Sequence, residues 1–214
     1  MEFEPGHLYH VFNRGNNSQK IFFTPANYLY FLNKIKTNIL PHADILAWCL
    51  MPTHFHLMIH VKEPELVTIF KSPAQYSTAF NLTEQVTKKV TSSGHQLSNN
   101  IGNLLSSYTK AIQKQENRTG SLFQHRTKAP CLTRMNGISK AWFDSAYGAI
   151  MNVSIPEKEY PQVCFNYIHG NPVKDRLVKL PEEWEYSSAR DYAGLRNGKL
   201  INKNRVKEFG LKYF

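Results

Sequence analysis

The segment HFHLMIHV, residues 54–61, constrains the fold more than any other stretch, because it alternates between two kinds of side chain. Successive side chains of a β-strand point to opposite faces of the sheet. On a strand, one face would be continuously apolar and β-prone, with Phe55, Leu57, Ile59 and Val61. The other face would carry His54, His56, Met58 and His60. The pattern predicts a strand whose apolar face lies in the core.

Two histidines of this segment, His54 and His56, would be neighbours on the same face of the strand. Two interpretations stay open on this pattern alone. The histidines are a pair of half-buried strand residues, which a bare His-x-His pattern favours. Alternatively, their imidazoles bind one metal ion, for which two neighbouring nitrogen ligands are suitable.

The residues before this segment predict the order strand, helix, strand, strand. The strands would be HLYHVFNR, residues 7–14, and ADILAWCLM, residues 43–51, with PTH as a tight connection to the histidine strand. A helix is expected over residues 24–40, because Thr24 is a good N-cap and Pro25 suits the first helical position. This order is most of the first half of a split, ferredoxin-like sheet.

The second half of the chain predicts more helix than strand. A polar loop is expected at residues 91–100, and helices at 101–115, 136–151 and 156–173. The last helix should stop near Pro172, because the residue before a proline disfavours helical geometry. The whole chain is then an α+β protein, and no function is assigned to residues 64–98.

Charge favours a polyanionic partner. Lys and Arg number 26 against 16 Asp and Glu, which gives a formal net charge of +10. Nucleic acid is the first candidate, and a merely solubilising surface charge is the alternative.

The cysteines and the absence of long apolar runs predict a cytoplasmic protein that does not associate with a membrane. The three cysteines are scattered without a Cys-x-x-Cys pair, which is typical of a reducing compartment. The first residues, MEFEPGHLYH, lack the features of an export signal, and no apolar run is long enough to span a membrane.

A second unusual stretch is FNYIHGNPVKDRLV, residues 165–178. Tyr167 and Asn171 are four residues apart, so on a helix their side chains project from one face. Taken separately, Tyr167 is explained by core packing and Asn171 by a C-terminal cap. Taken together with the histidine pair, they indicate a polar site.

His54-Phe55-His56 matches the HUH pattern of histidine, hydrophobic residue and histidine. With a helical tyrosine downstream, the chain resembles the single-tyrosine HUH transposases of the insertion-sequence type, and more closely the REP-associated tyrosine transposases. The resemblance runs through YHVFNRGNN, CLMPTHFHLMI, SYTKAIQKQENRTGSLFQHR, YIHGNPVKDRLV and EYSSARDY, which together span nearly the whole chain.

The resemblance implies a fold and its division along the chain. It implies an HUH endonuclease fold with a ferredoxin-like (split βαβ, RRM-like) antiparallel sheet and helices on one face. Residues 1–180 would form the HUH tyrosine transposase domain. Residues 181–214 would be a basic C-terminal extension of the same domain.

The resemblance also implies an activity, namely metal-dependent cleavage and strand transfer of single-stranded DNA, as in DNA transposition and recombination. The substrate would be hairpin-forming repeat DNA. Tyr167 would be the nucleophile and would form a 5′-phosphotyrosine intermediate. His54, His56 and Asn171 would bind Mg²⁺ or Mn²⁺, since mixed nitrogen and oxygen ligands suit these ions better than structural zinc.

A surface for single-stranded DNA should combine basic and stacking side chains. The candidates are Arg14, Lys110, Lys114, Arg118, Phe123, His125, Arg126 and Lys128, with a solvated charged face as the alternative. Tyr108 is in phase with an apolar helical stripe, which indicates packing or a DNA contact. His169 is a weaker candidate for a DNA contact or a general base.

The competing hypothesis is a catalytically silent protein that binds single-stranded DNA or RNA sequence-specifically and has a ferredoxin-like sheet. The proposed open face has histidines and few aromatic residues, which disfavours RNA binding. The presence of His54, His56 and Tyr167 disfavours an inactive relative. A monomer is favoured over a dimer. The recognised DNA sequence and the preferred metal are not determined by the sequence.

Overall fold

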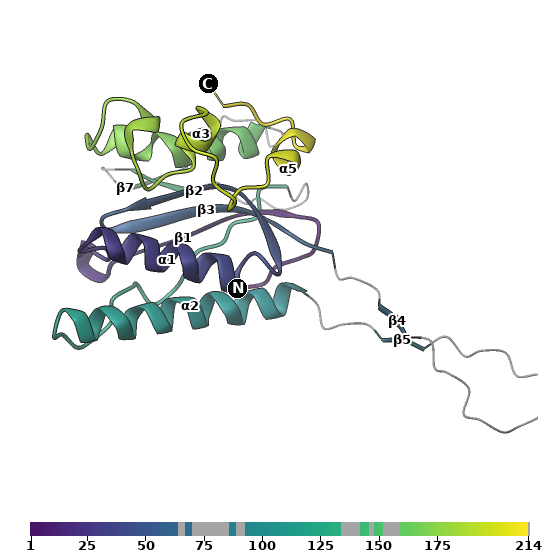
Figure 1. Cartoon of the computed structure of the whole chain (residues 1–214), viewed down its shortest axis with the longest axis horizontal. Coiled ribbons are helices and arrows are strands. Elements are labelled where there is room, and N and C mark those ends of the chain that lie inside the picture. The colour runs from purple at the N-terminus through teal and green to yellow at the C-terminus, as the bar shows by residue number, and fades with distance from the viewer. Residues whose placement is uncertain are drawn as a thin grey trace, which may run out of the picture.

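The computed structural model of the chain describes residues 1–63, 67–69, 86–88, 93–133, 142–145, 148–151 and 159–213. A three-stranded antiparallel sheet lies at its centre, with β1 (Leu8–Arg14), β2 (Ala43–Met51) and β3 (His54–Val61) in the order β1-β3-β2. The strands agree with the predicted ones, and the protein is a mixed helix-and-sheet structure as expected (Figure 1).

Two helices cover the predicted core face of β3. Helix α1 (Pro25–Asn38) begins after Thr24 as predicted, where the Asn27 side-chain oxygen accepts a hydrogen bond of 3.0 Å from the Thr24 amide. Helix α2 (Ser93–Gln115) packs beside α1 on the same side of the sheet (Figure 1). All four residues of the apolar face of β3 are buried in this cluster, which confirms their predicted place in the core.

The loop expected at residues 91–100 is wrong for residues 93–100, which form the first turns of α2. Leu97 and Ile101 are buried in line with Leu104, Tyr108 and Ile112, at helical spacing. Residues 93–100 are mostly polar, which is why the sequence predicted a loop. One apolar residue per turn is nevertheless enough to pack a helix against the core when its other side faces solvent.

The other face of the sheet is covered as well, which corrects the expectation of helices on one face. Helix α3 (Tyr160–Lys174) lies against β2 and β3 there, together with the short helices α4 (Ala189–Tyr192) and α5 (Lys203–Glu208) (Figure 1). Met58 and Cys49 pack against Phe165 and Ile168 of α3. The apolar residues on this face of the strands require a cover, and the C-terminal third of the chain provides it.

Helix α3 ends at Lys174, two residues after Pro172, which agrees with the predicted stop near that proline. Pro172 lacks an N–H, but it lies in the last turn, so only one helical hydrogen bond is lost. The Asp175 amide, three residues after Pro172, donates to the Asn171 carbonyl at 2.9 Å and closes the helix. The consequence is that Asn171 stays on the helix face instead of leaving it.

An extended segment, residues 122–132, runs antiparallel to β1 along its outer edge. Phe12 and Lys128 exchange backbone hydrogen bonds of 2.9 and 3.0 Å, and the Leu132 amide donates to the Leu8 carbonyl at 2.8 Å. The segment satisfies the edge of the sheet and brings basic residues beside β1.

The helix expected at residues 136–151 is wrong for the part that the structure describes. Residues 142–145 and 148–151 form an antiparallel strand pair, β6 (Trp142–Ser145) and β7 (Gly148–Met151). Aromatic and branched residues such as Trp142, Phe143 and Ile150 favour strands. The remainder of that range lies outside the described residues, as does most of residues 64–92, where β4 (Val67–Ile69) pairs with β5 (Val86–Lys88).

Residues 181–213 pack against β2. After the short 3-10 helix η3 (Pro181–Glu183), the chain hydrogen-bonds to the strand at two points: Leu50 donates to Tyr186, and Ser188 donates to Trp48. A third backbone hydrogen bond joins Asn202 to Ile45 at 2.8 Å. None of the described helices is long and apolar enough to cross a membrane.

Candidate metal and nucleic-acid site

A pocket opens where the C-terminal end of α3 meets β1, β3 and the 122–132 segment. Its volume is about 90 Å³, which is space for several water molecules or one hydrated ion. It is lined by Phe12, Asn13, Arg14, Thr53, His54, His56, Gln124, Arg126, Lys128, Asn171, Lys174 and Asp175. The residues predicted as metal ligands, His54, His56 and Asn171, therefore all line one pocket.

The histidine pair lies at the start of β3. The ring centroids of His54 and His56 are 5.0 Å apart, with the rings nearly perpendicular at 82°. His54 is half-buried, and its Nδ1 lies 3.0 Å from the Thr53 hydroxyl. The strand alternation thus sets both imidazoles on one face, as the pattern predicted.

His56 has a buried ring nitrogen that suits a metal ligand. Its Nδ1 hydrogen-bonds to Nε2 of His10 at 2.9 Å, whereas its Nε2 has no hydrogen-bond partner in the described part of the chain. Burial lowers the pKa of His56 well below its usual value, and the charges of His54, His10, Arg14 and Lys174 lower it further. The ring is therefore neutral at neutral pH, which is the form that coordinates metals.

Asn171 lines the pocket from helix α3. Its side-chain nitrogen donates to the Tyr167 carbonyl at 2.8 Å, which leaves the amide oxygen Oδ1 as the atom that could act as a ligand. Within the described ranges, no group of three or more His, Cys, Asp and Glu residues is arranged to hold a metal. A cation in this pocket would therefore depend on the two imidazoles and on an amide oxygen.

Tyr167 lies one helical turn before Asn171 and next to His56. Its ring meets the His56 ring edge to face, with centroids 5.3 Å apart, and the His10 ring in the same way at 6.0 Å. The Lys174 ammonium lies 5.7 Å from the centre of the Tyr167 ring. Tyr167 is half-buried and is not among the residues that line the pocket.

Basic side chains surround the pocket. Of the predicted DNA-binding residues, Arg14, Arg126 and Lys128 line it, and Arg14 pairs with His54 across the strands. Lys174 adds a fourth cation from α3. Such a group of cations beside an open pocket is suited to phosphate oxygens.

Other predicted DNA-binding residues lie elsewhere. Lys110 and Lys114 are exposed on α2, across the sheet from α3, and the Arg118 guanidinium donates to the Gln19 side chain at 2.5 Å (Figure 1). His125 is exposed between the pocket residues Gln124 and Arg126.

Phe123 is not available for base stacking in this structure, which corrects its prediction. It is only 6% exposed and packs with Phe55 and Tyr108 in the core. It lies in the edge segment beside β1, and its ring turns inward because that position faces the apolar side of the sheet.

Among the residues that sequence reasoning missed are His10, which contacts His56, and the charged residues Lys174 and Asp175, which line the pocket. His10 shares a strand face with Arg14, a signal present in the alternation of residues 8–14. Lys174 and Asp175 follow Asn171 by three and four residues, within the helical reach of that side chain.

Two other helical residues have structural roles. Tyr108 is fully buried and its hydroxyl donates to the Ile21 carbonyl at 2.7 Å, so it packs and does not face DNA. His169 is buried with its Nε2 2.7 Å from the Ser188 hydroxyl. Because it is buried and hydrogen-bonded there, His169 is not available for a DNA contact or as a general base, which corrects that expectation.

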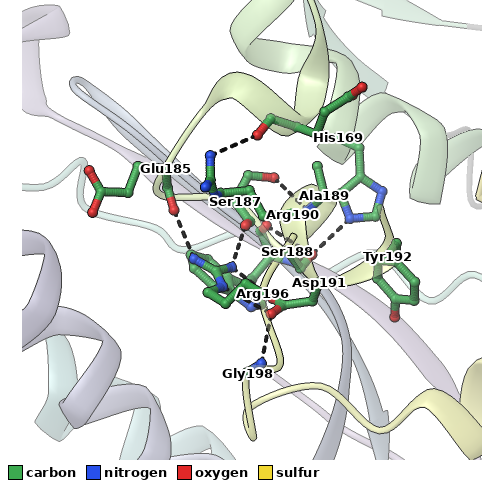
Figure 2. A network of polar contacts seen from close by, with 12 residues as sticks. His169, Glu185, Ser187, Ser188, Ala189, Arg190, Asp191, Tyr192, Arg196 and Gly198 are labelled. Carbon is green, nitrogen blue, oxygen red and sulfur yellow. Dashed lines mark hydrogen bonds and ion pairs between the residues drawn. The ribbon is translucent and has the colours of Figure 1, made fainter. Parts of the chain in front are cut away.

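A polar network of the C-terminal segment fixes α3 on the sheet (Figure 2). The Ser188 hydroxyl interacts with His169 and with both backbone groups of Trp48, at 2.9 and 3.2 Å from its nitrogen and oxygen. Nearby, Asp191 accepts two hydrogen bonds from Arg196, at 2.9 and 2.7 Å, and one of 2.8 Å from the Gly198 amide (Figure 2). The network ties α3 to β2, the neighbour of the histidine strand.

No family model matches the sequence, and no curated protein matches it. Among solved structures, the chain is similar to a REP-associated tyrosine transposase bound to a REP hairpin, with 16% sequence identity and a TM-score of 0.47. The likeness covers 91% of this chain and 82% of that one.

Proposed function

We propose that this protein is a metal-dependent nuclease and strand transferase of the HUH single-tyrosine type, acting on single-stranded, hairpin-forming DNA. The observation that carries the proposal is the bare, buried Nε2 of His56, in a pocket that also contains His54 and Asn171. The order of the three strands, with residues 122–132 in a fourth position beside β1, supports a ferredoxin-like sheet.

The ligand set fits Mg²⁺ or Mn²⁺. His54, His56 and the oxygen of Asn171 would hold the ion, and open coordination positions would remain toward the pocket. When bound, such an ion neutralises the charge that develops on the non-bridging phosphate oxygens. The protein itself provides cations for the same purpose, because Arg14 and Lys174 stand beside His56.

The basic residues would hold the DNA backbone in the pocket. Arg126 and Lys128 are exposed on the edge segment, and Arg14 reaches the pocket from the end of β1. Arginine can bind two phosphate oxygens at once and thereby orient the scissile phosphate. The single DNA strand would then run between residues 122–132 and the C-terminal end of α3.

Tyr167 would supply the nucleophile. Its phenolic oxygen would attack the phosphorus, and the bond from phosphorus to the 3′-oxygen of the preceding nucleotide would break. That oxygen takes up a proton and leaves as a 3′-hydroxyl, while the phenol loses its proton to solvent. Because the phosphotyrosine conserves the bond energy, a 3′-hydroxyl can attack it and join a new strand without ATP.

The proposed experiment is incubation of the protein with single-stranded hairpin DNA and Mn²⁺, followed by a denaturing gel. DNA labelled at its 3′ end should become covalently attached to protein, and DNA labelled at its 5′ end should be released as a shorter free strand. EDTA should prevent both results. An adduct that carries the 5′ label would contradict the direction of cleavage.

The ligand assignment is tested with the double variant His54→Ala/His56→Ala. It should lose metal-dependent cleavage and keep most DNA binding, because the basic residues of the pocket remain. Circular dichroism serves as the control for folding. If the double variant does not fold, the histidines are structural and the assignment is wrong.

The arrangement also supports action within one chain. Tyr167 contacts His56 of its own protomer, with ring centroids 5.3 Å apart, so a monomer has all proposed groups together. A mixture of Tyr167→Phe with the His54→Ala/His56→Ala double variant should then stay inactive. Recovery of cleavage in the mixture would indicate a dimer that exchanges its tyrosines.

No observation favours the silent RNA-binding alternative. RNA recognition on a ferredoxin-like sheet needs an open face with aromatic residues. Here the face that carries His56 and Met58 is covered by α3. If the protein binds DNA but forms no covalent adduct with any divalent metal, it is a silent binding protein and not the proposed enzyme.

A further inference from the structure

His10 contacts the proposed metal ligand His56 from the neighbouring strand. Its Nε2 lies 2.9 Å from Nδ1 of His56, the ring centroids are 5.1 Å apart, and the two rings are 29° from parallel. We propose that His10 is a positioning residue that holds the His56 ring with its Nε2 toward the pocket. This inference rests on the proposed function, because it assigns His10 a role toward the same metal site.

The position of His10 follows from the strand pairing. β1 and β3 are antiparallel, and Phe12 lies opposite His56. His10 is two residues before Phe12, so its side chain is on the same face and reaches His56 diagonally. The contact between the two imidazoles is therefore a product of the register and not of a flexible loop.

The surroundings of His10 prevent its ring from turning away. Its ring stacks on Phe12 with centroids 4.6 Å apart, and Tyr167 approaches it edge to face at 6.0 Å. It is 2% exposed. Because the ring is enclosed by aromatic neighbours, its Nε2 stays directed at His56.

The hydrogen bond decides which nitrogen of His56 carries the proton. If Nδ1 of His56 is protonated, it donates to Nε2 of His10, and the lone pair of His56 Nε2 faces the pocket. If His10 donates instead, His56 carries its proton on Nε2, where it has no acceptor within the described ranges. A buried donor without an acceptor is unfavourable, and a protonated nitrogen does not bind metal. His10 as acceptor thus selects the ligand form of His56.

The test compares two replacements of His10 by their affinity for Mn²⁺ alone, measured by electron paramagnetic resonance without DNA. His10→Phe keeps the ring and removes the acceptor, and it should weaken Mn²⁺ binding by about 10- to 100-fold, as losses of such supporting hydrogen bonds do. His10→Gln places an amide oxygen near the former Nε2, and it should restore most of the affinity. Equal affinities of wild type and His10→Phe would overturn the inference.

His60 offers a matched control. It is a buried histidine on the same face of β3, its ring lies 5.4 Å from that of Phe209, and it is not among the residues that line the pocket. His60→Phe should therefore leave the Mn²⁺ affinity unchanged. If His60→Phe weakens Mn²⁺ binding as much as His10→Phe does, the effect is a general loss of packing and the inference is wrong.

His56→Ala separates this inference from the proposed function. If Mn²⁺ binding is the same in His56→Ala and wild type, the proposed metal site itself fails. If binding depends on His56 but not on His10, only the positioning role fails.

A measurement on the unaltered protein is available if His10→Phe does not fold. Nitrogen-15 NMR in saturating Mg²⁺ should show His56 protonated on Nδ1. Protonation on Nε2 would overturn the inference.

Discussion

Two helical tyrosines show how the surroundings of a residue decide its role. Tyr108 is fully buried, and its hydroxyl is held by the Ile21 carbonyl at 2.7 Å. Tyr167 is half-buried beside His56, close to the pocket that contains Asn171. The first hydroxyl stabilises the core, whereas the second belongs to a ring that contacts His56 and is the proposed nucleophile.

Tyr167→Phe should abolish the covalent DNA adduct, because it removes the attacking oxygen and keeps the ring. DNA affinity and the midpoint of thermal unfolding should barely change. Adduct formation on a denaturing gel and thermal unfolding are the measurements.

Tyr108→Phe is the matched control for Tyr167→Phe. It should still form the adduct but lose about 1 kcal/mol of stability, the usual contribution of one buried hydrogen bond. A phosphotyrosine mapped to Tyr108 by mass spectrometry would contradict the assignment, and so would an adduct that survives in Tyr167→Phe.

At the scale of elements, the position of α3 depends on a segment that follows it in the chain. Ser188 links His169 of α3 to Trp48 of β2 (Figure 2). Asp191, three residues after Ser188, forms an ion pair with Arg196 that holds this part of the chain in place. Tyr167 and Asn171 are on α3, so the C-terminal segment supports the helix that carries both proposed site residues. The EYSSARDY stretch then has a structural role at a distance from the pocket.

Asp191→Ala should lower the free energy of unfolding by about 2–4 kcal/mol. The carboxylate is 2% exposed and accepts three hydrogen bonds, two of them from Arg196. Its removal leaves the partly buried Arg196 guanidinium without a charged partner and with only the backbone carbonyls of Glu185 and Ser187 as acceptors, and breaking an ion pair from one side in this way is costly. Urea unfolding is the measurement.

Glu208→Ala is the control for Asp191→Ala. Glu208 pairs with Arg205 on the surface, with 58% of its side chain exposed, and such a pair contributes about 0–1 kcal/mol. Equal losses from the two variants would show that Asp191 has no special role in the network.

At the scale of the whole molecule, several histidines are buried in the neutral form. Burial lowers the pKa of His10 and of His169 to about 3, and the pKa of His56 is also well below its usual value. In the unfolded chain these rings bind protons below a pH of about 6.5, whereas the folded protein binds them only at much lower pH. Acid therefore favours the unfolded state.

Stability should accordingly decrease as the pH falls from 7 to 5. Below a pH of about 6.5, each buried histidine makes the free energy of unfolding fall by about 1.4 kcal/mol for every pH unit of acidification. Above that pH the unfolded chain no longer binds the proton, so this dependence disappears. Urea unfolding at several pH values is the measurement. His169 lies outside the pocket, and His169→Gln should reduce this slope by about 1.4 kcal/mol per pH unit, the contribution of one proton. An unchanged slope would contradict the neutral, buried state of His169.

The distribution of charge over the molecule predicts which basic residues make DNA affinity depend on salt concentration. Lys128 and Arg126 line the pocket, whereas Lys110 and Lys114 lie on α2, across the sheet from α3 (Figure 1). If phosphates bind at the pocket, single-stranded DNA affinity should fall steeply with salt concentration.

Arg126→Ala/Lys128→Ala should reduce the slope of log affinity against log salt by roughly 1–2, because each phosphate contact contributes about 0.7 for a single strand. Lys110→Ala/Lys114→Ala, with the same change of charge, should leave the slope unchanged. Fluorescence anisotropy measures both. A larger effect of the α2 pair would place the DNA on the opposite side of the molecule.

The sequence alone was sufficient for features that depend on neighbours along the chain. The alternation of residues 54–61 fixed which side chains of β3 enter the core and placed His54 beside His56. The start of α1 followed from Thr24 and Pro25. The spacing of Tyr167 and Asn171 put them on one side of α3, because periodicity and capping act within one or two turns.

Other features were decided only by tertiary structure, because they join residues far apart in the sequence. His10 and His56 are 46 positions apart, and Ser188 and Trp48 are 140 apart. The burial of Phe123 depends on the path of an edge segment beside β1. The cover that α3 forms over the second face of the sheet depends on packing against β2, because apolar residues from distant parts of the chain are buried together there.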